Sequence, residues 1–207
     1  MSRNLKSLIA DDHSVVRAGI RALLETESDF EVVGEAVNGL IAVKEAARLK
    51  PDVVIMDLMM PEMDGVEATR QICSQVPSAH VLLLTTFSTS DVIMEALEAG
   101  AIGALMKSVE DSSLISAIRK VANGESCIAP NVRELLKTDP PVPKLTTRQL
   151  EILESITQGL TNGDIAEKLS IRADSVNFHV MAILNKLGAA NRAEAVAIAL
   201  RKHLLKI

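Results

Sequence analysis

Two hydrophobic patterns divide the chain of 207 residues. Up to about residue 124, short runs rich in Val, Ile and Leu alternate with longer segments whose apolar residues recur three and four positions apart. The short runs are typical of buried strands, and the longer segments are typical of amphipathic helices. The pattern therefore predicts five strands, each followed by a helix; the strands read "LKSLIA", "DFEVVGE", "PDVVIMD", "HVLLLTT" and "GALMK".

This alternation of strands and helices predicts an α/β fold. Strands that are apolar along their whole length are buried on both faces, as in parallel sheets covered by helices. Right-handed crossover connections then give a doubly wound arrangement. We predict a flavodoxin-like, five-stranded parallel sheet whose strands lie in the order 2-1-3-4-5.

The rest of the chain has a different character. Residues 125–143 lose the alternation and end in "KTDPPVP", whose prolines can continue neither a helix nor a central strand. From Leu145 onward the pattern is helical throughout and predicts four short helices. We therefore expect an α/β domain over residues 1–124, a semi-rigid linker over 125–143 and an all-α helical domain over 144–207.

Composition narrows the class of protein. The chain has no Trp or Tyr, so its cores must be aliphatic. No apolar run approaches the ~20 residues of a membrane span, and "MSRNLKSLIADDH" reaches two aspartates before a signal-peptide hydrophobic region could form. Cys73 and Cys127 are too few for a disulfide framework or a zinc site. We expect a cytoplasmic protein with no membrane partner.

The two predicted domains carry opposite net charges. Residues 1–124 hold 11 basic and 18 acidic side chains, a net charge of −7, and residues 144–207 hold 9 basic and 6 acidic ones, a net charge of +3. An acidic N-terminal part and a mildly basic C-terminal part indicate two units with different partners. The positive charge of the second unit favours DNA.

Acidic residues follow two of the predicted strands. Asp11 and Asp12 come directly after the first strand, and Asp57 comes after the third. In the order 2-1-3-4-5 these strands are neighbours, so the three carboxylates converge where ligands bind in such sheets. Converging carboxylates raise one another's pKa unless a cation lies among them, and hard oxygen ligands suit Mg²⁺. The sequence predicts a magnesium site.

The remaining strand ends add a hydroxyl and a cation. Thr85 ends the fourth strand and Lys107 ends the fifth, so both are expected beside the carboxylates. Together these groups form a site for a phosphoryl group and its metal. A carboxylate can itself act as the nucleophile and form an acyl phosphate. Asp57 is the candidate nucleophile because it stands alone at the centre of the site.

The motifs "DDH", "D" before "LMMPEMDG", "TT" and "K" at these strand ends resemble a bacterial response-regulator receiver domain. The resemblance implies that a sensor histidine kinase phosphorylates Asp57. It also implies roles for the neighbouring residues: Mg²⁺ is bound by Asp12, Asp57 and the backbone carbonyl of Met59, Asp11 assists through water, Thr85 and Lys107 hold the phosphoryl oxygens, and Pro61 and Gly65 shape the loop. One departure is Ala104, which stands where receivers usually have an aromatic residue that turns inward on activation.

The C-terminal motifs "LTTRQLEILESITQGLTN", "IAEKL" and "VNFHVMAILNKLGAANRAEAVAIAL" resemble the helix-turn-helix domain of the NarL/FixJ (LuxR-type) group. The resemblance implies that the segment from Asp174 to Leu187 reads DNA and that the last helix pairs with its copy in a homodimer. Independently, the apolar spacing predicts that Ile165, Ala166 and Leu169 pack against Val176, Val180 and Ile183.

The expected reading face carries few positive charges. Asp174 and Asn177 stand where relatives commonly have lysines, and each lost phosphate contact removes ~0.9 from the salt slope. Asn177 can still read an adenine through a two-bond pair. The candidate DNA contacts are Thr161, Asn162, Arg172, Ser175, Asn177, Phe178 and Lys186.

Three functions are compatible with these residues. The first is a two-component response regulator and transcription factor in which phosphorylation of Asp57 controls dimerisation and binding to promoter half-sites. This is a switch and not a metabolic enzyme, since the receiver only assists its own phosphorylation and dephosphorylation. The second is a phospho-switched interaction protein whose helical domain docks another protein through Phe178 and Met181. The third is a magnesium phosphohydrolase, which leaves the helical domain without a purpose.

Overall fold

The computed structural model describes residues 4–86, 89–202 and 204–205. It divides into two compact units that meet in sequence at Pro140 and Pro141. Each unit has its own hydrophobic core, and each is described by itself below. Every helix within the described residues is too short or too polar to cross a lipid bilayer.

The first unit is built on a parallel sheet of six strands in the order β2-β1-β3-β4-β5-β6. This order confirms the predicted arrangement of the first five strands and adds a sixth at the edge beyond β5. The strands are β1 (Leu5–Ala10), β2 (Phe30–Ala36), β3 (Val53–Met56), β4 (His80–Thr85), β5 (Gly103–Met106) and β6 (Cys127–Ile128).

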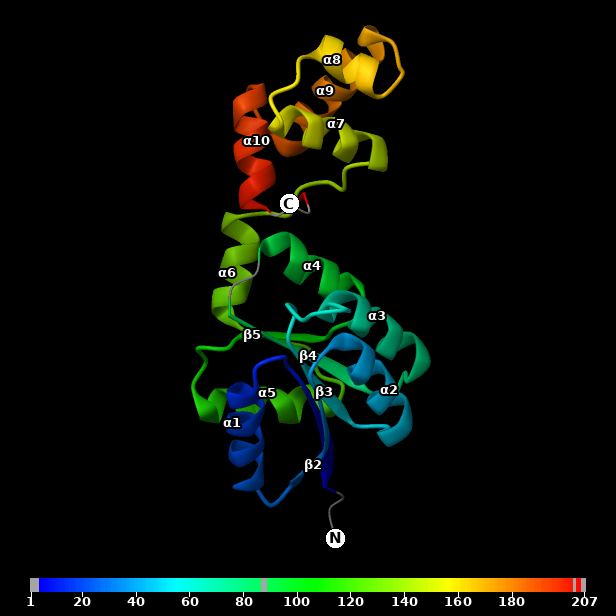
Figure 1. Ribbon diagram of the computed structural model, residues 1–207. Helices are drawn as coiled ribbons and strands as arrows, with labels where there is room; N and C mark the ends of the chain where they lie inside the picture. Colours follow the sequence, from blue (N-terminus) through cyan, green and yellow to red (C-terminus); the bar gives the residue numbers. More distant parts are fainter. Residues whose placement is uncertain (1–3, 87–88, 203, 206–207) are drawn as a thin grey trace. The chain divides into compact units, whose positions relative to one another are not determined.

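Helices cover both faces of this sheet because alternate residues along each central strand point in opposite directions. Figure 1 shows α1 and α5 on one face, and α2, α3 and α4 on the other. In β1, Leu8 belongs to the core under the second group and Ile9 to the core under the first. The helices are α1 (Ser14–Glu25), α2 (Gly39–Leu49), α3 (Gly65–Gln75), α4 (Ser90–Glu98), α5 (Asp111–Ala122) and α6 (Pro130–Thr138).

The segment predicted to be a linker is mostly part of this unit, so that prediction was wrong for residues 127–138. Cys127 and Ile128 pair with β5, and α6 begins at Pro130, where a proline suits the first turn of a helix. Val132 is fully buried in the sheet core, and Leu135 and Leu136 pack against it. Their spacing of three and four residues was a helical signal only two turns long.

Val132→Ala tests whether α6 stabilises the receiver core. Removing two buried methyl groups should cost about 1–2 kcal/mol of unfolding free energy and lower the melting temperature of the first unit by several degrees. Circular dichroism during heating measures the change. Glu134→Ala, on an exposed position of the same helix, is the matched control. Equal melting temperatures for the two variants would show that α6 behaves as a linker.

Over the residues that the structure describes, the second unit contains four helices, as predicted: α7 (Thr147–Thr157), α8 (Asn162–Lys168), α9 (Ala173–Leu187) and α10 (Arg192–Arg201). Ile165, Val176 and Ile183 are buried in one core, against which Ala166, Leu169 and Val180 pack, so the predicted pairing of α8 with α9 is confirmed. Capping boxes at Thr146 and Thr161 fix where α7 and α8 begin, and Gly188, with φ of 64°, ends α9.

Candidate functional site

The predicted carboxylate cluster forms at the carboxyl ends of β1 and β3. The Asp57 backbone N–H donates to the Ala10 carbonyl over 2.8 Å, which fixes the two strand ends side by side. Asp11 and Asp57 are nearly buried, and the side chain of Asp12 keeps a third of its surface exposed. One ligand atom from each of Asp11, Asp12, His13 and Asp57 lies within 4.8 Å of the others. These groups can surround one small cation.

Lys107 joins the cluster from the end of β5. Its Nζ lies 2.6 Å from Oδ2 of Asp11 and 2.8 Å from Oδ2 of Asp57. The backbone N–H of Lys107 donates to the Thr85 carbonyl over 2.7 Å, which brings the fourth strand end to the same edge. Burial lowers the pKa of Lys107, but its bonds to Asp11 and Asp57 together outweigh burial, so this pKa is raised. The lysine is therefore a cation in the site.

Burial also dominates at Asp57 and raises the pKa of this carboxyl above its ordinary value. The hydrogen bond and positive charge of Lys107 oppose the shift, the nearby Asp11 adds to it, and a backbone hydrogen bond from Met59 lowers it. Ionisation of Asp57 thus depends on cations close to it. The central carboxyl group of the site therefore ionises more readily when positive charge lies nearby.

His13 is a member of the cluster that the sequence reasoning did not assign. Its Nδ1 lies 2.6 Å from Oδ1 of Asp12, and its backbone N–H donates to Oδ1 of Asp11 over 2.9 Å. Arg17 donates from Nη1 to the Asp11 carbonyl over 2.8 Å, so the turn after β1 is held on two sides. The signal was present in the motif "DDH".

Gly65 explains the shape of the loop after β3. A Cβ at this position would lie 2.0 Å from the Asp57 carbonyl oxygen and 2.9 Å from the Leu58 Cα. The Gly65 backbone N–H donates to the Leu58 carbonyl over 2.9 Å, and Asp64 caps α3 through the Glu67 N–H. The loop therefore doubles back so closely on Asp57 that only glycine fits.

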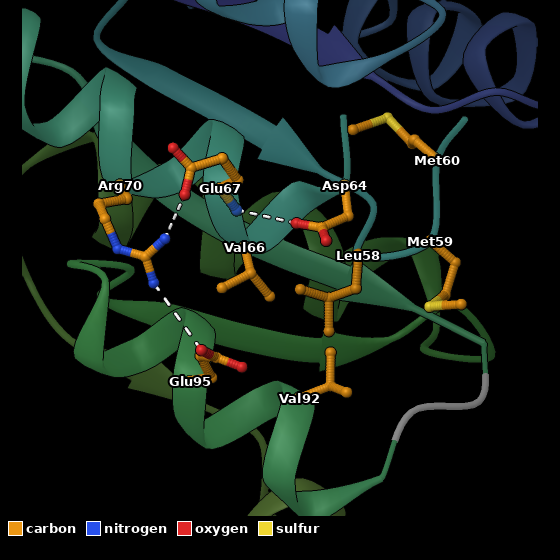
Figure 2. A pocket seen from close by; sticks show the side chains of 9 residues that line it. All are labelled: Leu58, Met59, Met60, Asp64, Val66, Glu67, Arg70, Val92 and Glu95. Atoms are coloured by element: carbon orange, nitrogen blue, oxygen red, sulfur yellow. Dashed lines mark hydrogen bonds and ion pairs between the residues drawn. The ribbon is translucent and has the colours of Figure 1, made fainter. Parts of the chain in front are cut away.

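A cleft of about 280 Å³ lies beside this loop, between α3 and α4. Figure 2 shows the side chains that line it. Met59, Met60 and Val92 contribute apolar side chains to it. Arg70 bonds Glu67 of its own helix and lies 3.9 Å from Glu95 of α4. The loop that carries Asp57 and helix α4, which follows Thr85 in the chain, thus line the same cleft.

A second candidate site lies on the helical unit, where α8, α9 and α10 meet. Phe178 and Met181 of α9 are 71% and 65% exposed, which is unusual for large apolar side chains. Asn177 is also exposed, and its Oδ1 accepts a hydrogen bond of 2.7 Å from Nδ2 of Asn162. Arg192 donates from Nη1 to Oδ1 of Asn162 over 2.7 Å. These polar residues form one chain across three helices.

The other predicted DNA contacts differ in how many hydrogen bonds they make within the protein. Arg172 is almost fully exposed and lies 4.0 Å from Asp174. Ser175, the residue after Asp174, is half-buried. The Thr161 hydroxyl and backbone N–H both donate to Asp164. Lys186 of α9 donates from Nζ to the Lys144 carbonyl and to Oε1 of Gln149, so it links α9 to the first residues of the unit and to α7. Its contact with DNA stays a prediction.

Two protein families match the chain at the regions just described. The response regulator receiver domain matches residues 7–119, which is more than half of the chain. The LuxR family of bacterial regulatory proteins matches residues 143–199. The chain belongs to the LuxR-type response regulators. Both resemblances noted in the sequence are thereby confirmed.

Relatives of this response regulator match it along nearly its whole length. It is 40% identical to the transcriptional regulatory protein LiaR of Bacillus subtilis, over 97% of this chain and 99% of that one. It is also 40% identical to the response regulator VraR of Staphylococcus aureus, over 98% of this chain and 99% of that one. The RcsB response regulator of Salmonella typhimurium is 26% identical, over 94% of this chain and 98% of that one, with a TM-score of 0.72. Two other RcsB structures are a complex with DNA and two dimers bound to two parallel DNAs. Each is 26% identical over 97% of this chain and 99% of that one, with a TM-score of 0.69.

The response regulator departs from the receiver pattern at Ala104, and the structure shows what surrounds this residue. Ala104 is buried in β5, pairs with Ile128 of β6, and belongs to the same core cluster as Val132 of α6. The Ala129 N–H donates to the Ala104 carbonyl over 2.9 Å. Instead of a mobile aromatic side chain, this position has a small residue packed beneath an added strand and helix.

Proposed function

We propose that a sensor histidine kinase phosphorylates this response regulator on Asp57 and that the modification controls its binding to DNA. The observation that carries the first part is the placement of Asp57, a nearly buried carboxylate 2.8 Å from the Lys107 ammonium and beside Asp11 and Asp12. Membership of the receiver family supports the same role.

In the transfer, an oxygen of Asp57 forms a bond to phosphorus as the bond between phosphorus and the imidazole nitrogen of the kinase's phosphohistidine breaks. The electron pair returns to that nitrogen, which takes up a proton. Lys107 lies close enough to Asp57 to hold a phosphoryl oxygen by charge and hydrogen bonding. Thr85, at the neighbouring strand end, supplies a hydroxyl to another oxygen. The chain assists its own modification and is not otherwise an enzyme.

Mg²⁺ suits the oxygen donors at this site. Asp11, Asp12 and Asp57 bring their ligand atoms together, and the exposed side of Asp12 leaves room for the waters that Mg²⁺ retains. These residues, with the backbone carbonyl of Met59, would hold the ion. When bound, Mg²⁺ offsets the negative charge that gathers on the phosphoryl oxygens.

DNA binding is assigned to the helical unit, with α9 as the reading helix. The net charge of +3 over residues 144–207 and the exposed polar groups at Asn177 and Arg172 support it. RcsB, a relative of the same fold, has been solved bound to DNA and as dimers on DNA. We assign the working form as a homodimer on two half-sites, with the exposed Leu200 of α10 at the pairing face. A cytoplasmic location fits this role and the two free thiols, Cys73 and Cys127.

A second function is favoured by the exposure of Phe178 and Met181. Large apolar side chains on an open helix face suit the binding of another protein, whereas DNA binding relies on cations. In this alternative, phosphorylation exposes or orients a protein-docking surface and the helical unit has little affinity for DNA.

The salt dependence of DNA binding separates the two functions. We expect the full chain, treated with acetyl phosphate and Mg²⁺, to bind duplex DNA with an affinity that falls steeply as salt rises. The logarithm of the binding constant should fall by about 0.9 per phosphate contact for each tenfold rise in salt. Fluorescence anisotropy of labelled DNA measures this slope. Binding that is absent, or insensitive to salt, would favour the protein-docking alternative.

Arg172→Ala identifies where the phosphate contacts are made. Loss of one contact should reduce the slope by about 0.9 and weaken binding to all sequences alike. Arg48→Ala makes the same change in net charge on an exposed part of α2 in the receiver and serves as the control. Equal slopes for the two variants would exclude Arg172 from the contact surface.

A further inference from the structure

We infer that Arg17 is a positioning residue for the metal-binding turn after β1. By holding the Asp11 carbonyl, it keeps the carboxylates of Asp11 and Asp12 where they can bind Mg²⁺ together with Asp57. This role rests on the proposed binding of Mg²⁺ at the site. Arg17 itself touches neither the ion nor the phosphoryl group and acts only through the turn.

The Arg17 side chain bonds two segments that are distant in sequence. Its Nη1 donates to the Asp11 carbonyl over 2.8 Å, and its Nε donates to Oε2 of Glu35 on β2 over 3.1 Å. Only 13% of the side chain is exposed, so the guanidinium is packed in place. A guanidinium presents its donors in a rigid planar fork, which suits it to join two acceptors. Arg17 therefore forms a bridge from β2 to the turn.

The same strand also holds Asp11 from the other side. The Asp11 backbone N–H donates to the carbonyl of Ala36, the residue after Glu35, over 3.1 Å. The N–H and the C=O of Asp11 are thus both bonded to the end of β2, the first directly and the second through Arg17. These contacts close a ring that restricts movement of the turn relative to the sheet.

The carbonyl that Arg17 holds belongs to the peptide group between Asp11 and Asp12. A peptide group is planar, so fixing its oxygen also fixes the direction in which the chain enters Asp12. The Asp11 carboxylate is already bonded to Lys107, whereas the Asp12 carboxylate contacts His13, whose side chain is 67% exposed. Rotation of the peptide would turn the Asp12 carboxylate away from the other ligand atoms. The support from Arg17 therefore matters most for Asp12.

Glu35 holds Arg17 and balances its charge. Arg21, one turn later on α1, donates from Nε to Oε1 of Glu35 over 2.6 Å. The hydrogen bond from Arg21 keeps the pKa of Glu35 below its ordinary value against the effect of burial, and the hydrogen bond from Arg17 adds to this. Glu35 is therefore ionised at neutral pH, and its negative charge offsets the positive charge of Arg17 close to the cation site.

Position and charge make opposite predictions for the loss of Arg17. A guanidinium repels Mg²⁺, so a variant that lost only a positive charge should bind the ion as tightly as wild type or more tightly. A variant that lost the support of the Asp11 carbonyl should bind it more weakly, because residues that hold metal ligands in place contribute about 10- to 100-fold to affinity. The sign of the change in affinity therefore separates the two roles.

Arg17→Met is the test, because methionine keeps an apolar stem of similar length and has no donor. Isothermal titration calorimetry of the unphosphorylated full chain with Mg²⁺ should give a Kd at least about 10-fold above that of wild type. Phosphorylation of Asp57 by acetyl phosphate should need correspondingly more Mg²⁺ and should recover when Mg²⁺ is raised. Arg21→Met is the matched control: it loses the same charge and a hydrogen bond to Glu35 but keeps the contact with Asp11, so its Kd should equal that of wild type.

Thermal unfolding without Mg²⁺ separates positioning from stability. Arg17→Met and Arg21→Met both lose a charged hydrogen bond and should both melt below wild type, yet only the first should bind Mg²⁺ more weakly. Arg17→Lys is a second variant that keeps the charge. Because an ammonium lacks the planar fork, it should hold one of the two acceptors well and not both. Its Kd for Mg²⁺ is expected to lie between those of wild type and Arg17→Met.

Three results would overturn the role of Arg17 while leaving the proposed function intact. The first is a folded Arg17→Met variant that binds Mg²⁺ as tightly as wild type or more tightly. The second is equal weakening in Arg17→Met and Arg21→Met, which would show a general loss of stability. The third is wild-type affinity in Arg17→Lys, which would show that the bridge is not needed.

Failure of the proposed function would look different. A wild-type chain that binds no Mg²⁺ in the calorimeter would overturn the metal site and the role of Arg17 together. A wild-type chain that binds Mg²⁺ but takes up no phosphate on Asp57 would overturn the proposed phosphorylation alone.

Discussion

Asp57→Ala is expected to take up no acid-labile phosphate from acetyl phosphate, so that labelling falls to the background of the assay. Alanine has no nucleophile, and the other buried carboxylate, Asp11, is already engaged by the Lys107 ammonium and the His13 N–H. Intact-protein mass spectrometry before and after acid treatment measures the phosphate. Asp111→Ala, at an exposed position in the first turn of α5, should be labelled as wild type.

The same variant should lose no thermal stability in the absence of Mg²⁺. Burial raises the pKa of Asp57 in the folded protein, so its ionisation at neutral pH opposes folding. The sign follows from linkage. When the pKa of a carboxyl is higher in the folded state than in the unfolded state, the protein becomes less stable as the pH rises through the folded-state pKa. Lys107 keeps Asp11 as a partner at 2.6 Å when Asp57 is removed. Persistent labelling of a well-folded Asp57→Ala variant would identify a different phosphate acceptor.

Gly65→Ala is expected to have the second largest effect, because the added methyl group would collide with backbone and not with a movable side chain. Its Cβ would lie 2.0 Å from the Asp57 carbonyl oxygen, so the loop must shift and carry the Asp57 carboxylate with it. Overpacking of this kind costs about 1–3 kcal/mol or more. We expect a lower melting temperature and at least a tenfold slower phosphorylation by acetyl phosphate, since displacement of a reacting group by 1 Å can cost a factor of ~100.

Gly19→Ala provides the control for Gly65→Ala. Gly19 lies on the exposed face of α1, and a Cβ there would meet no atom within 4 Å. Alanine should stabilise this helix by about 0.5–1 kcal/mol and leave phosphorylation unchanged. If Gly65→Ala behaved like Gly19→Ala, the close approach of the loop to Asp57 would have no part in the site.

The strand order and the residues at the strand ends could be predicted because both depend on simple periodicity. Apolar runs marked the strands, and parallel strands bring their carboxyl ends to one edge, so Asp57 and Lys107 were expected together and lie 2.8 Å apart. The pairing of α8 with α9 followed from the spacing of Ile165, Val176 and Ile183 in the same way.

What the sequence did not predict depends on contacts between side chains from distant segments. The bonding of His13 to Asp12 and Asp11 depends on the conformation of one turn, and no pattern of apolar residues encodes it. The hydrogen bonds from Arg192 to Asn162 and from Asn162 to Asn177 join three helices, so they form only when all three helices are in place. The helix α6 was missed because two turns of apolar spacing carry little weight beside a run of prolines.

The sixth strand also protects the edges of the sheet against pairing with other chains. Without it, the apolar strand β5 would be an edge whose unpaired N–H and C=O groups invite intermolecular sheet formation. β6 is two residues long and is followed at once by a helix, so the edge offers almost no backbone for another chain to extend. At the opposite edge, β2 carries Glu31 and Glu35, and charges on an edge strand discourage pairing. A receiver cut at residue 124 would lose the first of these protections, and it should aggregate where one ending at residue 140 stays dispersed.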